Sequence, residues 1–174
     1  MLKKRYQLKN HFQEKNKTEI YATIELQPSR LKIEYEIINN LSSYHFPKET
    51  KQQRANELWR DTCFELFIAN HSSTEYYELN ISPSTQWNAY HFKSYKEEMR
   101  ETDVFSTPSI ISHQLDKSYN LSFEMAFQED IFVKKLSINL AVILLDKEEM
   151  RHFYAINRCK ESPDFHDRFY HVCI

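Results

Sequence analysis

The chain of 174 residues contains 41% hydrophobic and 28% charged residues, and its formal net charge at pH 7 is −2. This length and composition indicate one domain with a sizeable core and exclude a disordered chain. The weak net charge favours neither nucleic acid nor an anionic membrane as a partner, and no apolar run reaches the ~20 residues that cross a bilayer.

The first predicted elements form a hairpin. Apolar and polar residues alternate in Ile20–Leu26 and again in Leu31–Ile37, which is the pattern of half-buried strands, and Gln27–Arg30 between them is a turn signal. Because the chain has no glycine, we expect its strands to be joined by longer connections rather than by two-residue glycine turns. The polar segment Asn39–Arg60 is predicted to be such a connection, with a helical turn near Lys51–Leu58.

The middle of the chain contains three predicted strands, at Thr62–Ala69, Tyr76–Ser82 and Trp87–Phe92. In the first two, an apolar face alternates with a face that carries carboxyl, amide and aromatic groups. The charged segment Lys93–Thr107 is predicted to be a loop.

The remaining predicted strands are Ser109–Gln114, Leu121–Phe127, Ser137–Leu145, His152–Ile156 and Phe169–Val172. Ser137–Leu145 is apolar on both sides, as expected of a central strand that is covered on both faces. With nine or so strands and no long segment of helical period, the chain is predicted to be all-β, an antiparallel β-sandwich with long loops and little helix. No linker divides it, so residues 1–174 are expected to form a single domain.

The cysteines and the amino-terminal stretch bear on the cellular compartment. Cys63, Cys159 and Cys173 are odd in number and have no CxxC spacing, which fits reduced thiols and excludes the usual zinc-finger patterns. The basic start of the chain is not followed by an apolar stretch, so we predict no secretory signal and a cytoplasmic protein.

A series of motifs resembles a known family. The segments Leu58–Phe67, Tyr77–Ser84, Trp87–Phe92 and Pro163–His166 together resemble DOMON-like bacterial proteins related to family 9 carbohydrate-binding modules. The resemblance implies a jelly-roll-like β-sandwich with a ligand-binding face; related domains bind sugars, and other DOMON domains bind haem. The chain departs from the family pattern where Thr85 and Gln86 replace a turn glycine, and where Asp167 replaces a second histidine.

Three polar residues on two predicted strands are the main candidates for a ligand site. Glu65, Glu78 and Asn80 point away from the apolar sets of their strands, and Tyr76 shares that face. If the two strands pair, an aromatic platform edged by carboxyl and amide groups results, which suits the C–H faces and hydroxyls of a sugar. The alternative is that these residues form the solvated face of an outer sheet.

Four further residues complete the predicted ligand-binding set. Trp59 and Trp87 are candidates for stacking on a ligand, the alternative being ordinary core or rim positions. Asp164 and His166 are close enough in sequence to act as a polar pair, the alternative being a charged loop near the carboxyl terminus. One histidine with one carboxylate is too little for a metal site, so no metal is predicted.

The predicted function is a non-catalytic module, without a cofactor, that binds a carbohydrate or another small polar ligand. One alternative is a glycan-processing enzyme that uses Glu65 and Glu78 as paired carboxyls. Another is haem binding, for which His91, Met99 and Met125 are the available axial ligands. The third is a protein-interaction domain without a small ligand. The sequence contains no nucleophile elbow, no phosphate-binding glycine loop and no HExxH zinc motif.

Overall fold

The structure is a computed structural model that describes residues 1–12, 17–128, 132 and 135–174, and within this part of the chain the protein is all-β. The strands are β1 (Leu2–Asn10), β2 (Glu19–Gln27), β3 (Arg30–Ile38), β4 (Cys63–Asn70), β5 (Tyr76–Ile81), β6 (Trp87–Phe92), β7 (Arg100–Glu101), β8 (Ser109–Gln114), β9 (Ser118–Ala126), β10 (Leu136–Leu145), β11 (Arg151–Ala155) and β12 (Val172–Cys173). Short 3-10 helices occur at η1 (Leu41–Ser43), η2 (Leu58–Arg60) and η3 (Arg168–Tyr170). Among the described residues, no helix is long and apolar enough to cross a membrane.

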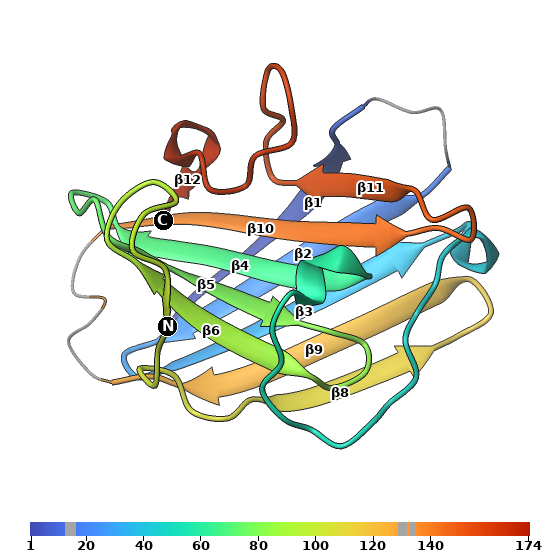
Figure 1. The fold of residues 1–174 in the computed structure, drawn as a ribbon, viewed down its shortest axis with the longest axis horizontal. Coiled ribbons are helices and arrows are strands. Elements are labelled where there is room, and N and C mark those ends of the chain that lie inside the picture. The colour runs from blue at the N-terminus through green and yellow to red at the C-terminus, as the bar shows by residue number, and fades with distance from the viewer. Residues whose placement is uncertain (13–16, 129–131, 133–134) are drawn as a thin grey trace.

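The strands form two packed layers, as Figure 1 shows. The front layer has the order β7-β6-β5-β4-β10-β11, with β12 pairing on β10, and the back layer has the order β1-β2-β3-β9-β8. Strand β1 joins the layers, because Leu2–Leu8 pairs with β2 while Lys9 and Asn10 pair with β11. The pairs are antiparallel, so the predicted antiparallel β-sandwich is confirmed. The jelly-roll form of the sandwich stays a prediction.

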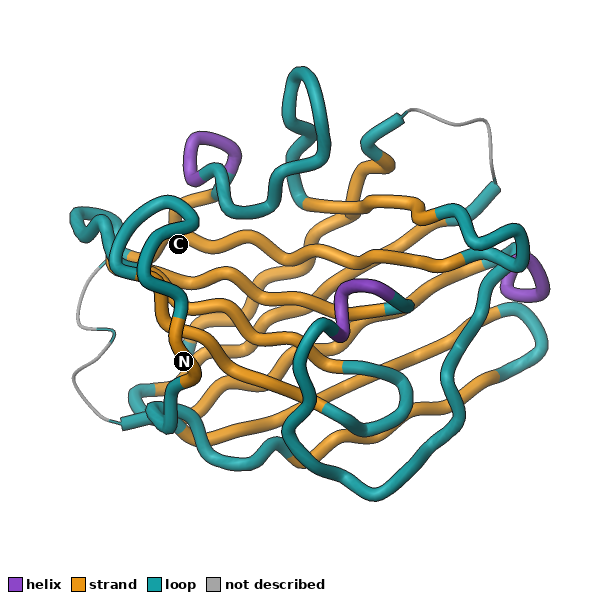
Figure 2. Tube along the Cα trace, viewed as in Figure 1, coloured by secondary structure: helices purple, strands orange, loops and turns teal. Residues whose placement is uncertain are grey.

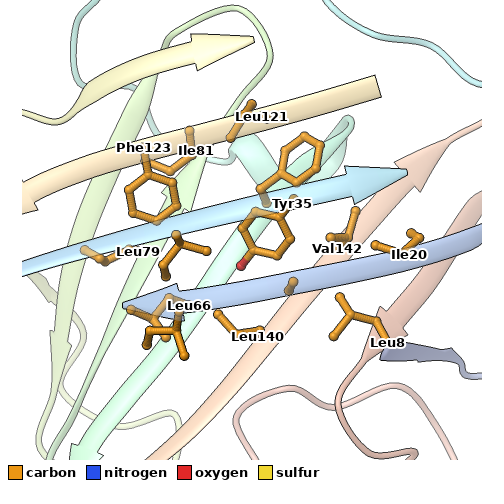
Figure 3. Packing of buried hydrophobic residues seen from close by; sticks show 14 of the residues in the cluster. Leu8, Ile20, Tyr35, Leu66, Leu79, Ile81, Leu121, Phe123, Leu140 and Val142 are labelled. Atoms are coloured by element: carbon orange, nitrogen blue, oxygen red, sulfur yellow. The ribbon is translucent and has the colours of Figure 1, made fainter. Parts of the chain in front are cut away.

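The main core lies between the two layers. Leu66, Leu79 and Leu140 of the front layer face Tyr35 and Phe123 of the back layer, and all are at most 1% exposed (Figure 3). The predicted period-2 alternation produces this arrangement, because every second side chain of a strand points to the same side. Burying one such side chain stabilises the fold by roughly 1.5–3 kcal/mol.

The front layer is buried on its outer face as well. A second cluster there includes Phe67, Tyr76, Tyr90, Phe92 and Phe165. Strand β10 is buried at nearly every position, as predicted for a central strand. Strands β4 and β6 are equally buried, although the sequence predicted a solvated face as one alternative for β4. That outer face carries the candidate site.

Several expectations differ from the structure in detail. Strand β1 was not predicted, because its first residues, Lys3, Lys4 and Arg5, are basic and exposed and show no apolar–polar alternation. Lys3 and Arg5 pair with Glu25 and Glu36.

The predicted helical turn near Lys51–Leu58 is wrong in position, since the turn is η2 (Leu58–Arg60). The first half of the predicted strand Phe169–Val172 instead belongs to the helix η3, whose first turn is capped by the side chain of Asp167 accepting from the Phe169 N–H. Only Val172 and Cys173 pair as a strand.

The absence of glycine does not lengthen every connection. Strands β2 and β3 are joined by Pro28 and Ser29 alone, and neither residue has a positive φ. Thr85, at the position where the family pattern has glycine, has φ 70° and therefore takes the left-handed conformation that glycine favours. The chain tolerates such conformations at non-glycine residues at a cost of ~1–2 kcal/mol each.

The turn between β10 and β11 offers a direct test of this cost. Glu149 has φ 63° and is exposed, and its neighbour Glu148 is exposed without a positive φ. We expect Glu149→Gly to raise the free energy of unfolding by about 0.5–1 kcal/mol, because glycine removes the steric strain of the left-handed region. Glu148→Gly should lower the same quantity. Urea unfolding measures both, and equal shifts in the two variants would contradict the strain argument.

Candidate ligand-binding pocket

The outer face of the front layer is organised in rows that run across β4, β5 and β6. In one row Glu65 lies opposite Asn80, which lies opposite Asn88. In the next row Phe67 lies opposite Glu78, which lies opposite Tyr90. Side chains directly opposite each other on adjacent strands are separated by about 4.5–5.5 Å at Cβ, so the carboxyl and amide groups form one polar patch with aromatic rings beside it.

Segments distant in sequence surround this face and turn it into a pocket. The pocket has a volume of about 870 Å³ and is lined by the sheet face, by η2 and the residues before it, by the segment between β6 and β7, and by residues 163–166. Figure 2 shows η2 in front of the layer and the loops at its margins. The volume falls in the range of pockets that bind small molecules, roughly 300–1,000 Å³.

Six of the eight predicted site residues line this pocket: Trp59, Glu65, Glu78, Asn80, Asp164 and His166. Four separate segments supply them, so only the folded chain brings them together.

Glu78 and Asn80 form the centre of the pocket floor. Asn80 donates from Nδ2 to Oε1 of Glu78 over 2.7 Å. Asn80 is 1% exposed and Glu78 is 6% exposed. Burial raises the pKa of Glu78 to about 7, and the hydrogen bond from Asn80 only partly opposes this. The carbonyl oxygen Oδ1 of Asn80 is buried without a hydrogen-bond partner, and such an unsatisfied acceptor is costly unless a ligand or water supplies a donor.

Glu65 is the second buried carboxyl of the floor. It is 3% exposed, and its pKa is raised well above the usual value by burial and by the nearby charge of Glu78. Its backbone carbonyl accepts a 2.6 Å hydrogen bond from the hydroxyl of Tyr35, a core residue of the back layer. The floor strand is therefore tied to the opposite layer directly beneath the pocket.

His166 covers one side of the floor in a ring of aromatic side chains. Its ring centroid lies 4.9 Å from that of Phe67 and 5.1 Å from that of Phe92. Burial, with a smaller contribution from the charge of Lys96, lowers the pKa of His166 to about 4, so the imidazole is neutral at pH 7. Its Nδ1 then accepts from the Tyr76 hydroxyl over 2.8 Å, which leaves the proton on Nε2, 3.8 Å from Oε2 of Glu78. Because the imidazole is neutral and the two atoms are 3.8 Å apart, His166 and Glu78 do not form a salt bridge.

Asp164 is held at the rim by two donors. The Tyr95 hydroxyl and Nζ of Lys96, the latter at 3.0 Å, both donate to Oδ2 of Asp164. Burial alone would raise the pKa of Asp164, but these two hydrogen bonds outweigh it and lower the pKa. Oδ1 of Asp164 also accepts from the backbone N–H of His166 over 3.1 Å. The two residues of the predicted polar pair are therefore in contact, and Asp164 helps to position the backbone of His166.

Trp59 forms part of the rim. Its side chain lines the pocket and the residue is 40% exposed, which leaves ring surface for a ligand. The guanidinium groups of Arg60 and Arg151 lie 5.4 and 5.6 Å from the centre of the indole. These cation–π contacts orient the ring.

The prediction that Trp87 stacks on a ligand is corrected by its position in the structure. The residue lies on the opposite face of β6, in the main core, and is 3% exposed, so it does not reach the pocket. The guanidinium of Arg54 covers its ring at 4.5 Å. The strand alternation explains the placement, because Trp87 shares its side with Ala89, whereas Tyr90 and Phe92 point into the pocket.

Tyr76 lies beneath the pocket rather than in its wall. It is fully buried and stacks on Phe92 with the ring centroids 4.7 Å apart. Its hydroxyl bonds His166 and accepts from the Lys96 N–H over 3.1 Å. Tyr76 therefore positions two segments of the pocket without lining it.

Sequence reasoning missed several aromatic residues of the pocket: Tyr90, Phe92, Phe153 and Phe165. For Tyr90 the sequence contained a signal, because strand alternation places its side chain on the other face of the strand from Trp87. On that face it is the cross-strand neighbour of Glu78. Phe153 and Phe165 come from β11 and the segment after it, and no local pattern connects them to β5.

Of the three candidate axial ligands for haem, Met99 lines the pocket and is 60% exposed, whereas Met125 and His91 do not line it. Met125 lies in the main core, and both ring nitrogens of His91 are engaged, with Glu75 and with Arg100. Within the described ranges, no group of three or more His, Cys, Asp or Glu side chains is arranged to hold a metal ion.

Known structures with the same architecture give a comparison for the whole chain. A candidate carbohydrate-binding protein from Bacteroides uniformis superposes with a TM-score of 0.67 at 13% identity, covering 99% of this chain and 84% of that one. A family 9 carbohydrate-binding module from Caldicellulosiruptor kristjanssonii, in complex with cellotriose, superposes with a TM-score of 0.54 at 11% identity, covering 88% and 72%. At such identities the likeness concerns the fold. No protein-family profile matches the chain, and no curated protein matches its sequence.

Proposed function

We propose that the pocket binds a carbohydrate and that the protein is a non-catalytic binding module. The observation that carries the proposal is the pocket floor, where the buried Asn80 carbonyl lacks a donor beside the carboxyls of Glu65 and Glu78. Sugar hydroxyls are donors and acceptors at once, and they match an acceptor-rich floor. The fold likeness to a module solved with cellotriose supports the same proposal.

The wall of the pocket fits the other half of a sugar. Trp59, Tyr90 and Phe153 offer aromatic surface to the apolar C–H face of a pyranose. A ligand that lacks a matching hydroxyl leaves a buried polar group unpaired, at a cost of roughly 1–3 kcal/mol, so the floor discriminates between sugars.

Three related expectations belong to this proposal. The chain is a DOMON-like relative of family 9 modules, with a jelly-roll-like sandwich. It forms a single domain over residues 1–174. It acts in the cytoplasm.

The exposed tryptophan gives the most direct test. We expect Trp59→Ala to weaken cellotriose binding by about 10-fold or more, since the loss of aromatic contact area removes more than ~1.4 kcal/mol. Phe169 is the matched control, because it is an aromatic residue that is 82% exposed and does not line the pocket. Calorimetric titration of the parent, Trp59→Ala and Phe169→Ala measures the difference. Equal affinities in all three would remove Trp59 from the site, and no binding by the parent to any tested glycan would overturn the proposal.

A glycan-processing enzyme is the second candidate, favoured by one observation. Glu78 combines a pKa of about 7 with a second buried carboxyl, Glu65, in the same pocket, and perturbed carboxyl pairs are typical of glycoside hydrolysis. An enzyme would release a chromophore from aryl glycosides, and Glu78→Gln would abolish this release. Binding without turnover identifies the non-catalytic module.

A further inference from the structure

Among the described residues, no lysine or arginine side chain is paired with the two carboxyls of the pocket floor, Glu65 and Glu78. Three basic side chains line the pocket, and in the described part of the chain each has another partner. Lys96 pairs with Asp164, and Arg100 donates to Nδ1 of His91 over 3.2 Å. Arg151 lies over the rings of Trp59 and Phe153 at the rim. Without a paired cation, a buried carboxyl favours its protonated form, as the raised pKa values of Glu78 and Glu65 show, and a cationic ligand would stabilise the ionised form instead.

The floor also has the geometry for a group with several donors. Glu65 lies directly opposite Asn80, and Glu78 lies two residues before Asn80 on the same face of β5. The three side chains are therefore neighbours on one face of the sheet, and Oδ1 of Asn80 is buried there without a partner. A protonated primary amine has three N–H donors and no acceptor, so it suits neighbouring carboxyl and carbonyl oxygens that accept.

Aromatic rings flank the same position. Phe67 and Tyr90 lie on either side of Glu78 in one cross-strand row, and both line the pocket. The face of an aromatic ring attracts a cation, and the attraction grows when the site is desolvated. The ring quadrupoles therefore add to the two carboxyls.

We propose that the pocket selects a sugar that carries a protonated amino group, with the ammonium held by Glu65, Glu78 and Oδ1 of Asn80. This inference rests on the proposed carbohydrate function and assigns the class of sugar. An N-acetylated or hydroxylated sugar of the same backbone presents no charge to the floor and binds more weakly.

Binding of such a ligand is coupled to proton release. Because the pKa of Glu78 is about 7 and that of Glu65 is also raised, the empty floor is mostly protonated below neutral pH. An ammonium favours the ionised carboxyls and displaces protons from them.

The groups facing the floor include other titratable side chains, from several elements: Cys63 of β4, Tyr90 of β6, Glu101 of β7, Glu57, Lys96, Arg100, Arg151, Asp164 and His166. Nε2 of His166 lies 3.8 Å from Oε2 of Glu78, and the imidazole is neutral at pH 7 because burial lowers its pKa to about 4. The released protons therefore come from Glu65 and Glu78.

Three trisaccharides with one backbone test the inference. Cellotriose, the fully deacetylated chitosan trimer and triacetylchitotriose differ only in the group at C2, which is a hydroxyl, an ammonium or an acetamide. At about pH 6.5 we expect the chitosan trimer to bind about 10-fold more tightly than the other two. Calorimetry in two buffers of different ionisation enthalpy should show release of up to about one proton per ammonium trimer and none for the neutral trimers.

Glu78→Gln should abolish the preference, since it removes the charge while keeping an oxygen that accepts from Asn80. Glu65→Gln repeats the test in case one variant does not fold. Glu124→Gln, on the exposed face of β9 where Glu124 pairs with Arg30, is the matched control and should keep the preference. Circular dichroism checks the fold of each variant.

The outcomes separate the two proposals. Cellotriose binding without preference for the chitosan trimer would overturn the ammonium inference and leave carbohydrate binding standing. A preference that survives in both Glu65→Gln and Glu78→Gln would also overturn it, because the charge would then be recognised elsewhere. Failure of the parent to bind any of the three trimers at millimolar concentration would count against both.

Discussion

In the unliganded protein, the free energy of unfolding should change less with pH when Glu78 is replaced by glutamine. The difference between the parent and the variant should amount to about 3 kcal/mol between acidic and alkaline pH. The folded protein raises the pKa of Glu78 from 4.5 to about 7, and each pKa unit corresponds to about 1.36 kcal/mol. The protonated carboxyl therefore stabilises the folded state fully below about pH 4.5, and this contribution is lost as the pH rises through 7. Glutamine has no such titration.

Urea unfolding of parent and variant at about pH 4.5, 6 and 8 measures this difference. His166 and His171 contribute with the opposite sign, because burial lowers the pKa of each to about 4, but they are present in both proteins and cancel in the comparison. Glu124→Gln, which removes an exposed carboxyl, should follow the parent curve. If the parent and Glu78→Gln curves are parallel, the carboxyl is not buried as the structure shows it.

A substitution on the inner face of β4 should change the stability of the protein without changing its affinity for the ligand. Leu66 is fully buried in the main core, between Glu65 and Phe67, whose side chains point into the pocket. Leu66→Ala should lower the free energy of unfolding by about 3 kcal/mol, within the 2–5 kcal/mol measured for such truncations, because it leaves a cavity between the layers.

Ligand affinity should be nearly unchanged in the folded fraction of Leu66→Ala. Glu65→Gln, one residue away, should change affinity and pH dependence instead. Denaturation together with titration separates the two effects. A Leu66→Ala protein with parental stability would mean that the two layers do not pack through this residue.

Local alternation was sufficient to predict the two-layer architecture. The hairpin of β2 and β3 and the face shared by Glu65, Glu78 and Asn80 all follow from side chains that alternate about a strand. The same rule assigns Trp87 to the inner face, and its prediction as a ligand-stacking residue was wrong because residue type was given more weight than strand parity.

The burial of the polar face was beyond local reasoning. Glu65 and Glu78 alternate like residues on a solvated surface, but η2 and the residues before it, the segment between β6 and β7 and residues 163–166 enclose them in the pocket. These segments are distant in sequence, and nothing in their own pattern indicates where they pack. Strand β1 was missed for a related reason: its partners Glu25 and Glu36, which accommodate its basic residues, lie elsewhere in the chain.

The two tryptophans allow the central claim, that a carbohydrate binds on the outer face of the front layer, to be tested in one measurement. Trp59 lines the pocket, whereas Trp87 lies in the core on the other side of the sheet. In a ¹H–¹⁵N correlation spectrum titrated with cellotriose or the chitosan trimer, we predict that the indole N–H signal of Trp59 shifts, together with the backbone signals of Glu78 and Asn80. The Trp87 signal should stay in place. Shifts confined to the back layer, for example around Tyr21 and His113 in the smaller groove there, would contradict the account.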